Sequence, residues 1–196
     1  MASAVQPSRR VLSRGSEEAQ RGVTVFFFFF LLLLIGIFGT LALGAYKAAP
    51  WVPTRQQDVE RMLRAANVQP GELVVDLGSG DGRFLRTAVR QFGGRGLGFE
   101  LALVPYFISR LILWRELRRG QAEVRYRDFY HADLSSADVV TAFLTPRAMR
   151  KLAGKLHREL KPGSRIVSYA FAIPDWSPTV VDRPTPTSTR VFLYRV

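Results

Sequence analysis

A glycine-rich loop and two acidic residues are the part of this sequence best suited to chemistry. The loop, residues 78–82, reads Gly-Ser-Gly-Asp-Gly and directly follows a short apolar run that contains Asp76. Such a loop between a strand and a helix offers backbone amides to a ligand where side chains are absent. Glu100 ends the next apolar run, 24 positions after Asp76, where its carboxylate can accept hydrogen bonds from both hydroxyls of a ribose. The spacing therefore predicts a site for a nucleoside-bearing cofactor.

Two other kinds of site are not expected. The third glycine of the loop comes one position too early for the dinucleotide fingerprint G-x-G-x-x-G, and Arg83 occupies the required position, which disfavours nicotinamide binding. The sequence has no cysteine, which excludes disulfides, zinc–thiolate sites and thiol nucleophiles. His131 and His157 are isolated, so we predict no metal site.

Alternating strand and helix patterns surround the loop. Buried strands are predicted over 73–77, 96–100, 122–127, 138–144 and 164–170, and helices over 56–67, from the loop to 92, 103–119 and 147–160. This alternation predicts an α/β fold, a mostly parallel sheet with helices on both faces. The segment 190–194 alternates in polarity and predicts an antiparallel strand inside that sheet.

An apolar segment precedes this domain. Residues 23–46 carry no charge, and at ~1.5 Å rise per residue they span about 36 Å, enough to cross a hydrocarbon core of roughly 30 Å. We expect a basic tail over 1–22, a transmembrane helix over 23–46 and the catalytic domain over 47–196. A cleaved signal peptide and a buried soluble helix are the alternatives, and the length and the five consecutive phenylalanines disfavour them.

The charge balance favours anionic partners. Lys and Arg total 28 against 16 Asp and Glu, a net charge of +12, which suits phospholipid headgroups, nucleic acid or a phosphate-bearing ligand. Basic residues flank the apolar segment on both sides, so they do not determine its orientation.

Several segments resemble class I S-adenosylmethionine-dependent methyltransferases. VVDLGSGDGR at 74–83 is similar to the first motif of that class, GFE at 98–100 to its ribose-binding acid, and ELKPG at 159–163 to its turn into strand five. WVPT at 51–54 and FAIPDW at 171–176 resemble the membrane-anchored lysine methyltransferases of mitochondria that modify the adenine nucleotide translocase and the c-ring protein of ATP synthase, and their bacterial relatives. The resemblance implies a Rossmann-like domain.

The resemblance also implies roles for individual residues. Asp76 would orient the cofactor, Glu100 would hold its ribose, Asp128 would meet the adenine amino group and Phe129 would cover the adenine face. The glycine loop would let the methionine part approach the backbone. The implied cofactor-binding residues are Asp76, Gly78, Ser79, Gly80, Gly82, Glu100, Asp128 and Phe129. Thr145, Pro146 and Trp176 are the candidates for the catalytic acceptor pocket.

The implied reaction is S-adenosylmethionine-dependent methylation of a lysine in a membrane or membrane-proximal protein, next to a membrane with anionic lipid. Alternatives are a small-molecule, lipid or quinone methyltransferase at the bilayer, and a module that binds the cofactor without turnover. Nucleic acid is not the expected partner, because no N-P-P-Y-type segment stands at 144–146. Since S-adenosylmethionine is made in the cytosol and imported into organelle matrices, the domain is expected to face bacterial cytoplasm or the mitochondrial matrix.

Overall fold

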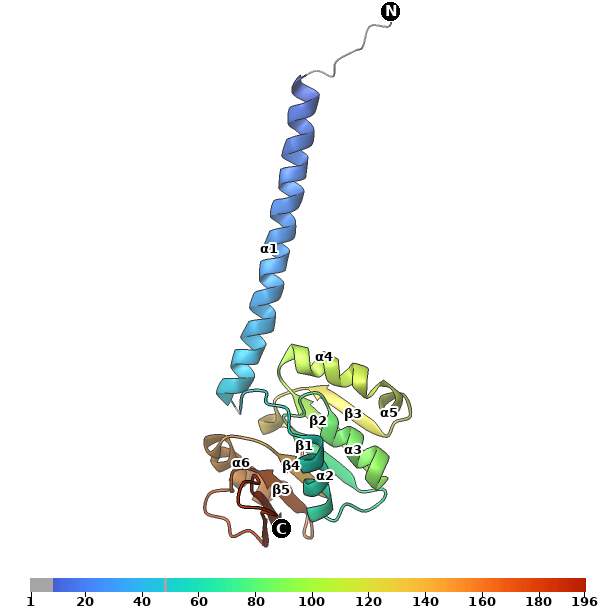
Figure 1. Cartoon of the computed structure of the whole chain (residues 1–196), viewed down its shortest axis with the longest axis vertical. Helices are drawn as coiled ribbons and strands as arrows, with labels where there is room; N and C mark the ends of the chain where they lie inside the picture. The colour runs from blue at the N-terminus through green and yellow to red at the C-terminus, as the bar shows by residue number, and fades with distance from the viewer. Residues whose placement is uncertain (1–8, 48) are drawn as a thin grey trace, which may run out of the picture. The chain divides into compact units, whose positions relative to one another are not determined.

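The computed structural model describes residues 9–47 and 49–196, and these divide into two compact units with the boundary between Gly39 and Thr40 (Figure 1). Helix α1 runs from Arg9 to Lys47. Its part from Gln20 to Lys47, 28 residues, is long and apolar enough to cross a membrane, by length and composition. The predicted span, 23–46, lies within this part, and the predicted basic tail, 1–22, lies partly outside the described residues.

The second unit is built on a seven-stranded sheet with the order β3-β2-β1-β4-β5-β7-β6. Neighbouring strands from β3 to β5 are parallel. Strand β7 pairs antiparallel with β5 on one side and with β6 on the other, so the final strand lies inside the sheet, as the sequence predicts. The bounds are β1 Leu73–Leu77, β2 Arg95–Glu100, β3 Ala122–Tyr126, β4 Val139–Ala142, β5 Arg165–Tyr169, β6 Val180–Asp182 and β7 Val191–Arg195.

Helices cover both faces of this sheet, which confirms the predicted Rossmann-like architecture. Successive strand residues point to opposite faces, so Val74 packs with helices α2 and α3, whereas Val75 packs with α6. Strand β1 is thereby buried on both sides, as expected for a parallel strand between helical layers. The bounds are α2 Gln56–Ala65, α3 Arg83–Phe92, α4 Leu103–Ile112, α5 Trp114–Arg118, a short 3₁₀ helix Phe129–His131, and α6 Pro146–Glu159.

The prediction of one continuous helix before β3 is wrong. The sequence predicts a single helix over 103–119, but the structure has α4 and α5, separated by Leu113 with φ −93° and ψ 8°. The Leu113 side chain is fully buried, and its Cδ1 lies 2.5 Å from where a Cβ on Gly82 would stand. Leu113 therefore fills the space left by a missing side chain, and the helix departs from regular geometry at the residue that makes this contact.

The loop after β5 depends on one buried hydrogen bond. The Ile173 amide donates to the Tyr194 hydroxyl of β7 at 2.9 Å, and the Tyr194 side chain is 1% exposed. We expect Tyr194→Phe to lower the free energy of unfolding by about 1–3 kcal/mol, because a buried amide loses its acceptor. Urea unfolding of the full chain in detergent, followed by tryptophan fluorescence, measures the change. Tyr126→Phe on the exposed side of β3 is the control, and equal effects of both changes would contradict this account.

Candidate cofactor pocket

The pocket lies where the strands β1, β2 and β4 end. From β1 the strand order runs through β2 to β3 on one side of the sheet, and from β4 to β5 on the other side. Open α/β sheets bind ligands at such a switch point, at the carboxyl ends of the strands. The pocket and its open mouth together hold about 880 Å³ of space free of protein atoms. Seven of the eight residues predicted to bind cofactor line it: Asp76, Gly78, Ser79, Gly80, Glu100, Asp128 and Phe129.

The Glu100 carboxylate ties the end of β2 to the glycine loop. Its Oε2 accepts a hydrogen bond from the Gly80 amide at 2.8 Å, and its Oε1 accepts from the Leu101 and Ala102 amides, each at 2.8 Å. Backbone donors therefore fix both oxygens: Oε1 already accepts two hydrogen bonds, and Oε2 keeps a further lone pair for a ligand. The result is a carboxylate already oriented before anything binds.

The loop differs from the sequence expectation in how its amides are used. The Gly78 and Ser79 amides both donate to the Phe99 carbonyl, at 3.0 and 2.9 Å, and the Gly80 amide is taken by Glu100. These donors hold the loop against β2 instead of pointing at a ligand. The loop therefore contributes shape and close backbone approach, while the acceptors in the pocket come from carboxylates.

Asp76 is a buried carboxyl beneath the loop. It is 4% exposed, and the Thr141 hydroxyl of β4 donates to its Oδ1 at 2.7 Å. Burial raises the pKa of Asp76 to about 8, against the opposing hydrogen bond from Thr141 and with help from the nearby Glu100 charge. A cationic ligand group beside Asp76 would stabilise its charged form.

Asp128 also lines the pocket. Its Oδ1 accepts from the Tyr130 amide at 3.0 Å and caps the 3₁₀ helix. Its Oδ2 lies 2.6 Å from the Lys47 ammonium. Partial burial alone would raise the pKa of Asp128, but Lys47 and the Tyr130 amide outweigh burial and hold that pKa below its usual value. Asp128 is therefore an ionised acceptor at the pocket, and the sequence offered no signal for its pairing with Lys47.

Residues 49–54 form one wall of the pocket. The Trp51 indole lies so close to the loop that a Cβ on Gly80 would stand 2.8 Å from its Nε1, and Gly80 has a φ of +54°. A glycine is therefore required there for space and for backbone conformation. Arg83 fastens this wall, because its guanidinium donates to the Thr54 carbonyl and to Asp81. The sequence analysis singled out WVPT at 51–54 for its resemblance to a family, but it did not place this segment in the pocket.

The remaining predicted residues lie outside the pocket lining. Gly82 is the left-handed N-cap of α3 and packs against Leu113. The Thr145 hydroxyl accepts from the Ala148 amide and caps α6, where Pro146 is the first helical residue. Trp176 packs against the rings of His157 and Tyr194. Phe143 and Leu144, which directly precede Thr145, line the pocket instead.

No group of three or more His, Asp or Glu side chains that could hold a metal ion occurs in the part of the chain that the structure describes. Glu100, Asp128 and Asp76 are each held by their own backbone or side-chain donors.

Comparison with known proteins identifies the family of this chain. Residues 76–180 match the family described as "ANTKMT methyltransferase domain". A protein-lysine N-methyltransferase of Saccharolobus islandicus is 38% identical over 133 residues, which are 67% of this chain and 83% of that protein. A human lysine N-methyltransferase of the ATP synthase c-ring protein is 33% identical over 129 residues, 66% of this chain and 54% of that enzyme. The matched region thus spans about half the length of the human relative.

A solved structure resembles the fold closely. The crystal structure of an RNA methyltransferase from Salinibacter ruber in complex with S-adenosyl-L-homocysteine has a TM-score of 0.69 and 34% sequence identity, and the match covers 74% of this chain and 93% of that one.

The buried Asp76 predicts an unusual pH dependence for the ligand-free protein. The folded state keeps the Asp76 proton up to about pH 8, whereas the unfolded chain loses it near the ordinary pKa of 3.8. Between these values the folded state binds more protons, so this group's contribution to stability is complete below the lower pKa and is lost as pH rises through about 8. Melting temperatures measured from pH 6 to pH 9 should fall less steeply with pH in Asp76→Asn than in the unchanged chain. Parallel curves would contradict this account.

Proposed function

This chain belongs to the ANTKMT methyltransferase-domain family and uses S-adenosylmethionine as its methyl donor, and from that premise we propose that it methylates the ε-amine of a lysine in a membrane or membrane-proximal protein. One observation carries the membrane part of the proposal. The pocket is lined both by the end of a candidate membrane span, Leu41 to Lys47, and by the residues that follow it, 49–54. Methyl transfer would thus take place beside the bilayer.

The residues of the pocket fit the donor. S-adenosylmethionine carries an ammonium group, two ribose hydroxyls and an adenine amino group, all of which donate hydrogen bonds. The pocket supplies the carboxylates of Asp76, Glu100 and Asp128 as acceptors.

We assign the roles from this geometry. Glu100, oriented by three backbone amides, holds the ribose by accepting a hydroxyl hydrogen bond at Oε2. Asp128, whose Oδ1 accepts from the Tyr130 amide and whose Oδ2 pairs with Lys47, accepts from the adenine amino group through a remaining lone pair, while Phe129 packs beside the base. Asp76 offsets the positive charge of the methionine part. All of these contacts act through binding and orientation.

When bound, S-adenosylmethionine supplies an electrophilic methyl group on a sulfonium that leaves as a neutral thioether. The chain's part is to present a neutral amine in line with that bond and to exclude water. The apolar walls contributed by Trp51, Phe143 and Leu144 suit this task, because desolvation disfavours the charged form of a lysine whose ordinary pKa is about 10.4. Thr145, Pro146 and Trp176 stay candidates for contacts to the acceptor chain outside the pocket itself.

We further propose that Gln20–Lys47 anchors the chain as a single-pass membrane protein, supported by its length and composition. The domain then faces bacterial cytoplasm or the mitochondrial matrix, where the methyl donor is present. The predicted organisation, a tail over 1–22, a span over 23–46 and a domain over 47–196, stays part of this proposal.

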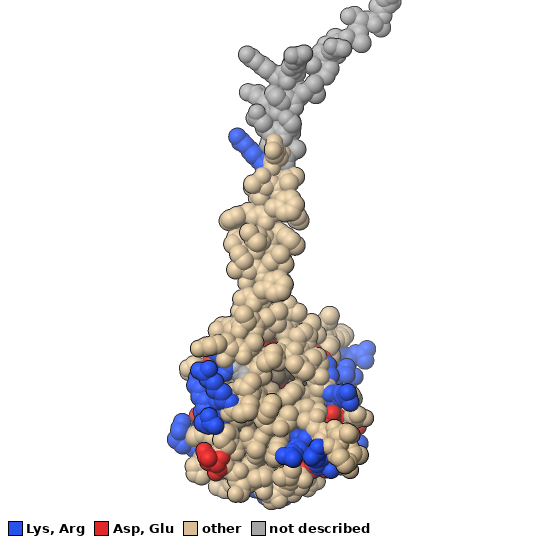
Figure 2. Space-filling model, turned by 60° about the vertical axis from the view of Figure 1, so that its left-hand side comes forward, with Lys and Arg blue, Asp and Glu red and all other residues tan. Residues whose placement is uncertain are grey.

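RNA is a second candidate acceptor, because the similar Salinibacter ruber structure is of an RNA methyltransferase and this chain carries a net charge of +12. On the face seen in Figure 2, however, lysines and arginines form separate groups and no continuous stripe. A lipid or quinone acceptor is the third possibility, since the pocket lining includes residues of the candidate span.

The acceptor assay uses tritiated S-adenosylmethionine, the purified full chain, and membrane, soluble and RNA fractions from cells that lack the protein. We expect label in a membrane protein band, at lysine by mass spectrometry. Label that is sensitive to ribonuclease would replace the lysine proposal with RNA methylation. Label that extracts into organic solvent would replace it with a lipid or quinone acceptor.

Glu100 provides the sharpest test of cofactor binding. In Glu100→Gln the negative charge is lost and an amide NH₂ group faces the backbone donors. We therefore expect the Kd for S-adenosylmethionine to rise about 10-fold to 100-fold. This rise corresponds to the ~1.5–3 kcal/mol that hydrogen bonds to a charged group contribute. Isothermal titration calorimetry measures it. Glu123→Gln removes the exposed partner of Arg125 on β3 and serves as the matched control. An unchanged Kd in Glu100→Gln would show that Glu100 does not take part in binding S-adenosylmethionine.

A further inference from the structure

Helix α4 and the first residue of α5 turn an apolar stripe outward. Phe107, Leu111 and Trp114 follow one another at helical spacing, and their exposed fractions are 62%, 76% and 48%. The opposite side of the same segment, with Ser109 and Leu113, is fully buried. A surface helix of a soluble domain normally turns its apolar stripe toward the core, and contiguous exposed apolar patches mark interaction sites.

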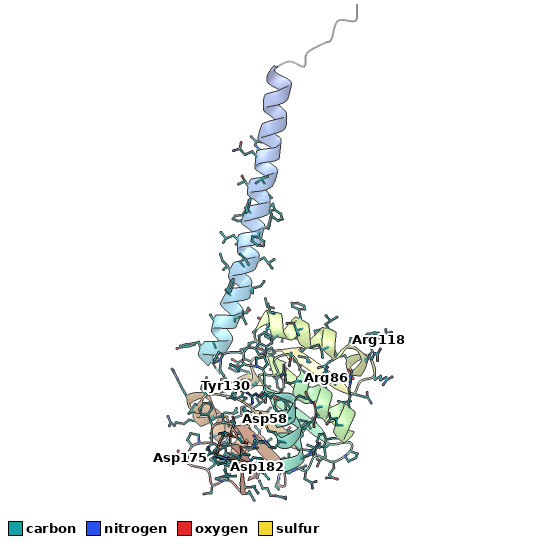
Figure 3. The ribbon with its side chains drawn as sticks, viewed as in Figure 1. Asp58, Arg86, Arg118, Tyr130, Asp175 and Asp182 are labelled. Carbon is teal, nitrogen blue, oxygen red and sulfur yellow. The ribbon has the colours of Figure 1, made fainter. Side chains whose placement is uncertain are left out.

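Arginines border this stripe. Arg110, Arg115, Arg118 and Arg119 are all exposed, and Figure 3 shows Arg118 at the outer edge of the domain beside α5. The Arg118 guanidinium lies 5.3 Å from the centre of the Trp114 ring. A shallow hollow is lined by Trp114 and by three of the arginines, 115, 118 and 119.

The same surface is poor in negative charge. Glu116 is the only acidic residue of α4 and α5. It is 5% exposed, and the Arg90 guanidinium lies 2.6 Å from its Oε1. The charge that this surface presents outward is therefore positive, and it complements an anionic partner.

The position of α4 favours a lipid partner. The Leu103 amide, at the start of α4, donates to the Thr40 hydroxyl at 3.2 Å. Thr40 belongs to the same compact unit as the domain and also to the candidate span Gln20–Lys47. It lies seven residues before the end of that span, roughly 10 Å at ~1.5 Å per residue, and the polar interface adds roughly 5–8 Å on each side of the hydrocarbon core. The start of α4 is thus tied to the last two turns of the candidate span, close to the expected membrane boundary.

We propose that the outer face of α4 and α5 docks on the bilayer that holds the span, as a second membrane contact. Phe107, Leu111 and Trp114 enter the boundary between headgroups and acyl chains, and the arginines bind the phosphates of anionic lipids. Aromatic residues and arginines are the side chains suited to this interface. The inference rests on the proposed insertion of the span, and it adds a fixed contact between the catalytic domain and the membrane.

The absence of cysteine from the sequence allows a clean test with single labels on the full chain. Leu111→Cys carries an environment-sensitive fluorophore, and Val181→Cys on β6, 49% exposed, is the matched control. Both are reconstituted into vesicles of phosphatidylcholine alone and with phosphatidylglycerol. We expect a blue shift, a loss of iodide quenching and quenching by spin-labelled lipid at position 111 in the anionic vesicles, with no change at position 181.

The charge contribution is tested in the same background. Arg118→Gln with Arg119→Gln should reduce the response at position 111 to anionic lipid, as should high salt, because exposed charge pairs are screened. Flotation and alkaline extraction report the insertion of the span separately. A chain that stays inserted while position 111 remains open to iodide in anionic vesicles would overturn the docking proposal and leave the proposed function intact. Shielding at 111 in lipid-free micelles, with cross-linking between two labelled copies, would overturn it in favour of self-association.

Discussion

The arrangement of the site depends on one carboxylate held by backbone amides. Glu100 receives the amides of Gly80, Leu101 and Ala102, so the end of β2, the glycine loop and the turn into α4 are tied to the same two oxygens. Charge-assisted hydrogen bonds of this kind are shorter and stronger than neutral ones. Because the acceptor is oriented before a ligand arrives, less binding free energy is lost in ordering it.

Burial of charge at the same place explains the remaining electrostatics. Asp76 lies under the loop with one hydrogen bond from Thr141, and its pKa of about 8 reflects a carboxyl that is costly to ionise without a cation nearby. Asp128 has such a cation in Lys47 and stays ionised. The two acids thus differ because Lys47 lowers the pKa of Asp128, whereas burial and the nearby charges of Glu100 and Asp81 raise that of Asp76.

The wall made by residues 49–54 relates the cofactor pocket to the chain that precedes the domain. Arg83 holds the Thr54 carbonyl on one side and Asp81 of the loop on the other, and Trp51 lies over Gly80. The glycine loop is thus packed between β2 and a segment that directly follows the candidate span. On its other side, Gly82 packs against Leu113, so the loop contacts both the segment 49–54 and the junction of α4 and α5.

The sequence alone determined the strands and their order along the chain, the glycine loop, the acidic residue Glu100 at the end of β2 and the apolar segment, because each depends on local composition and short spacing. Seven predicted cofactor residues meet in one pocket for the same reason, since parallel strands end at one edge. Only the tertiary structure decided that the loop amides serve β2, that Lys47 pairs with Asp128, that Trp51 covers Gly80 and that Trp176 packs elsewhere. These are contacts between residues distant in sequence, so local patterns carry no information about them. The outward stripe of α4 is decided in the same way, because periodicity places residues on one side of a helix and only packing selects the side that is buried.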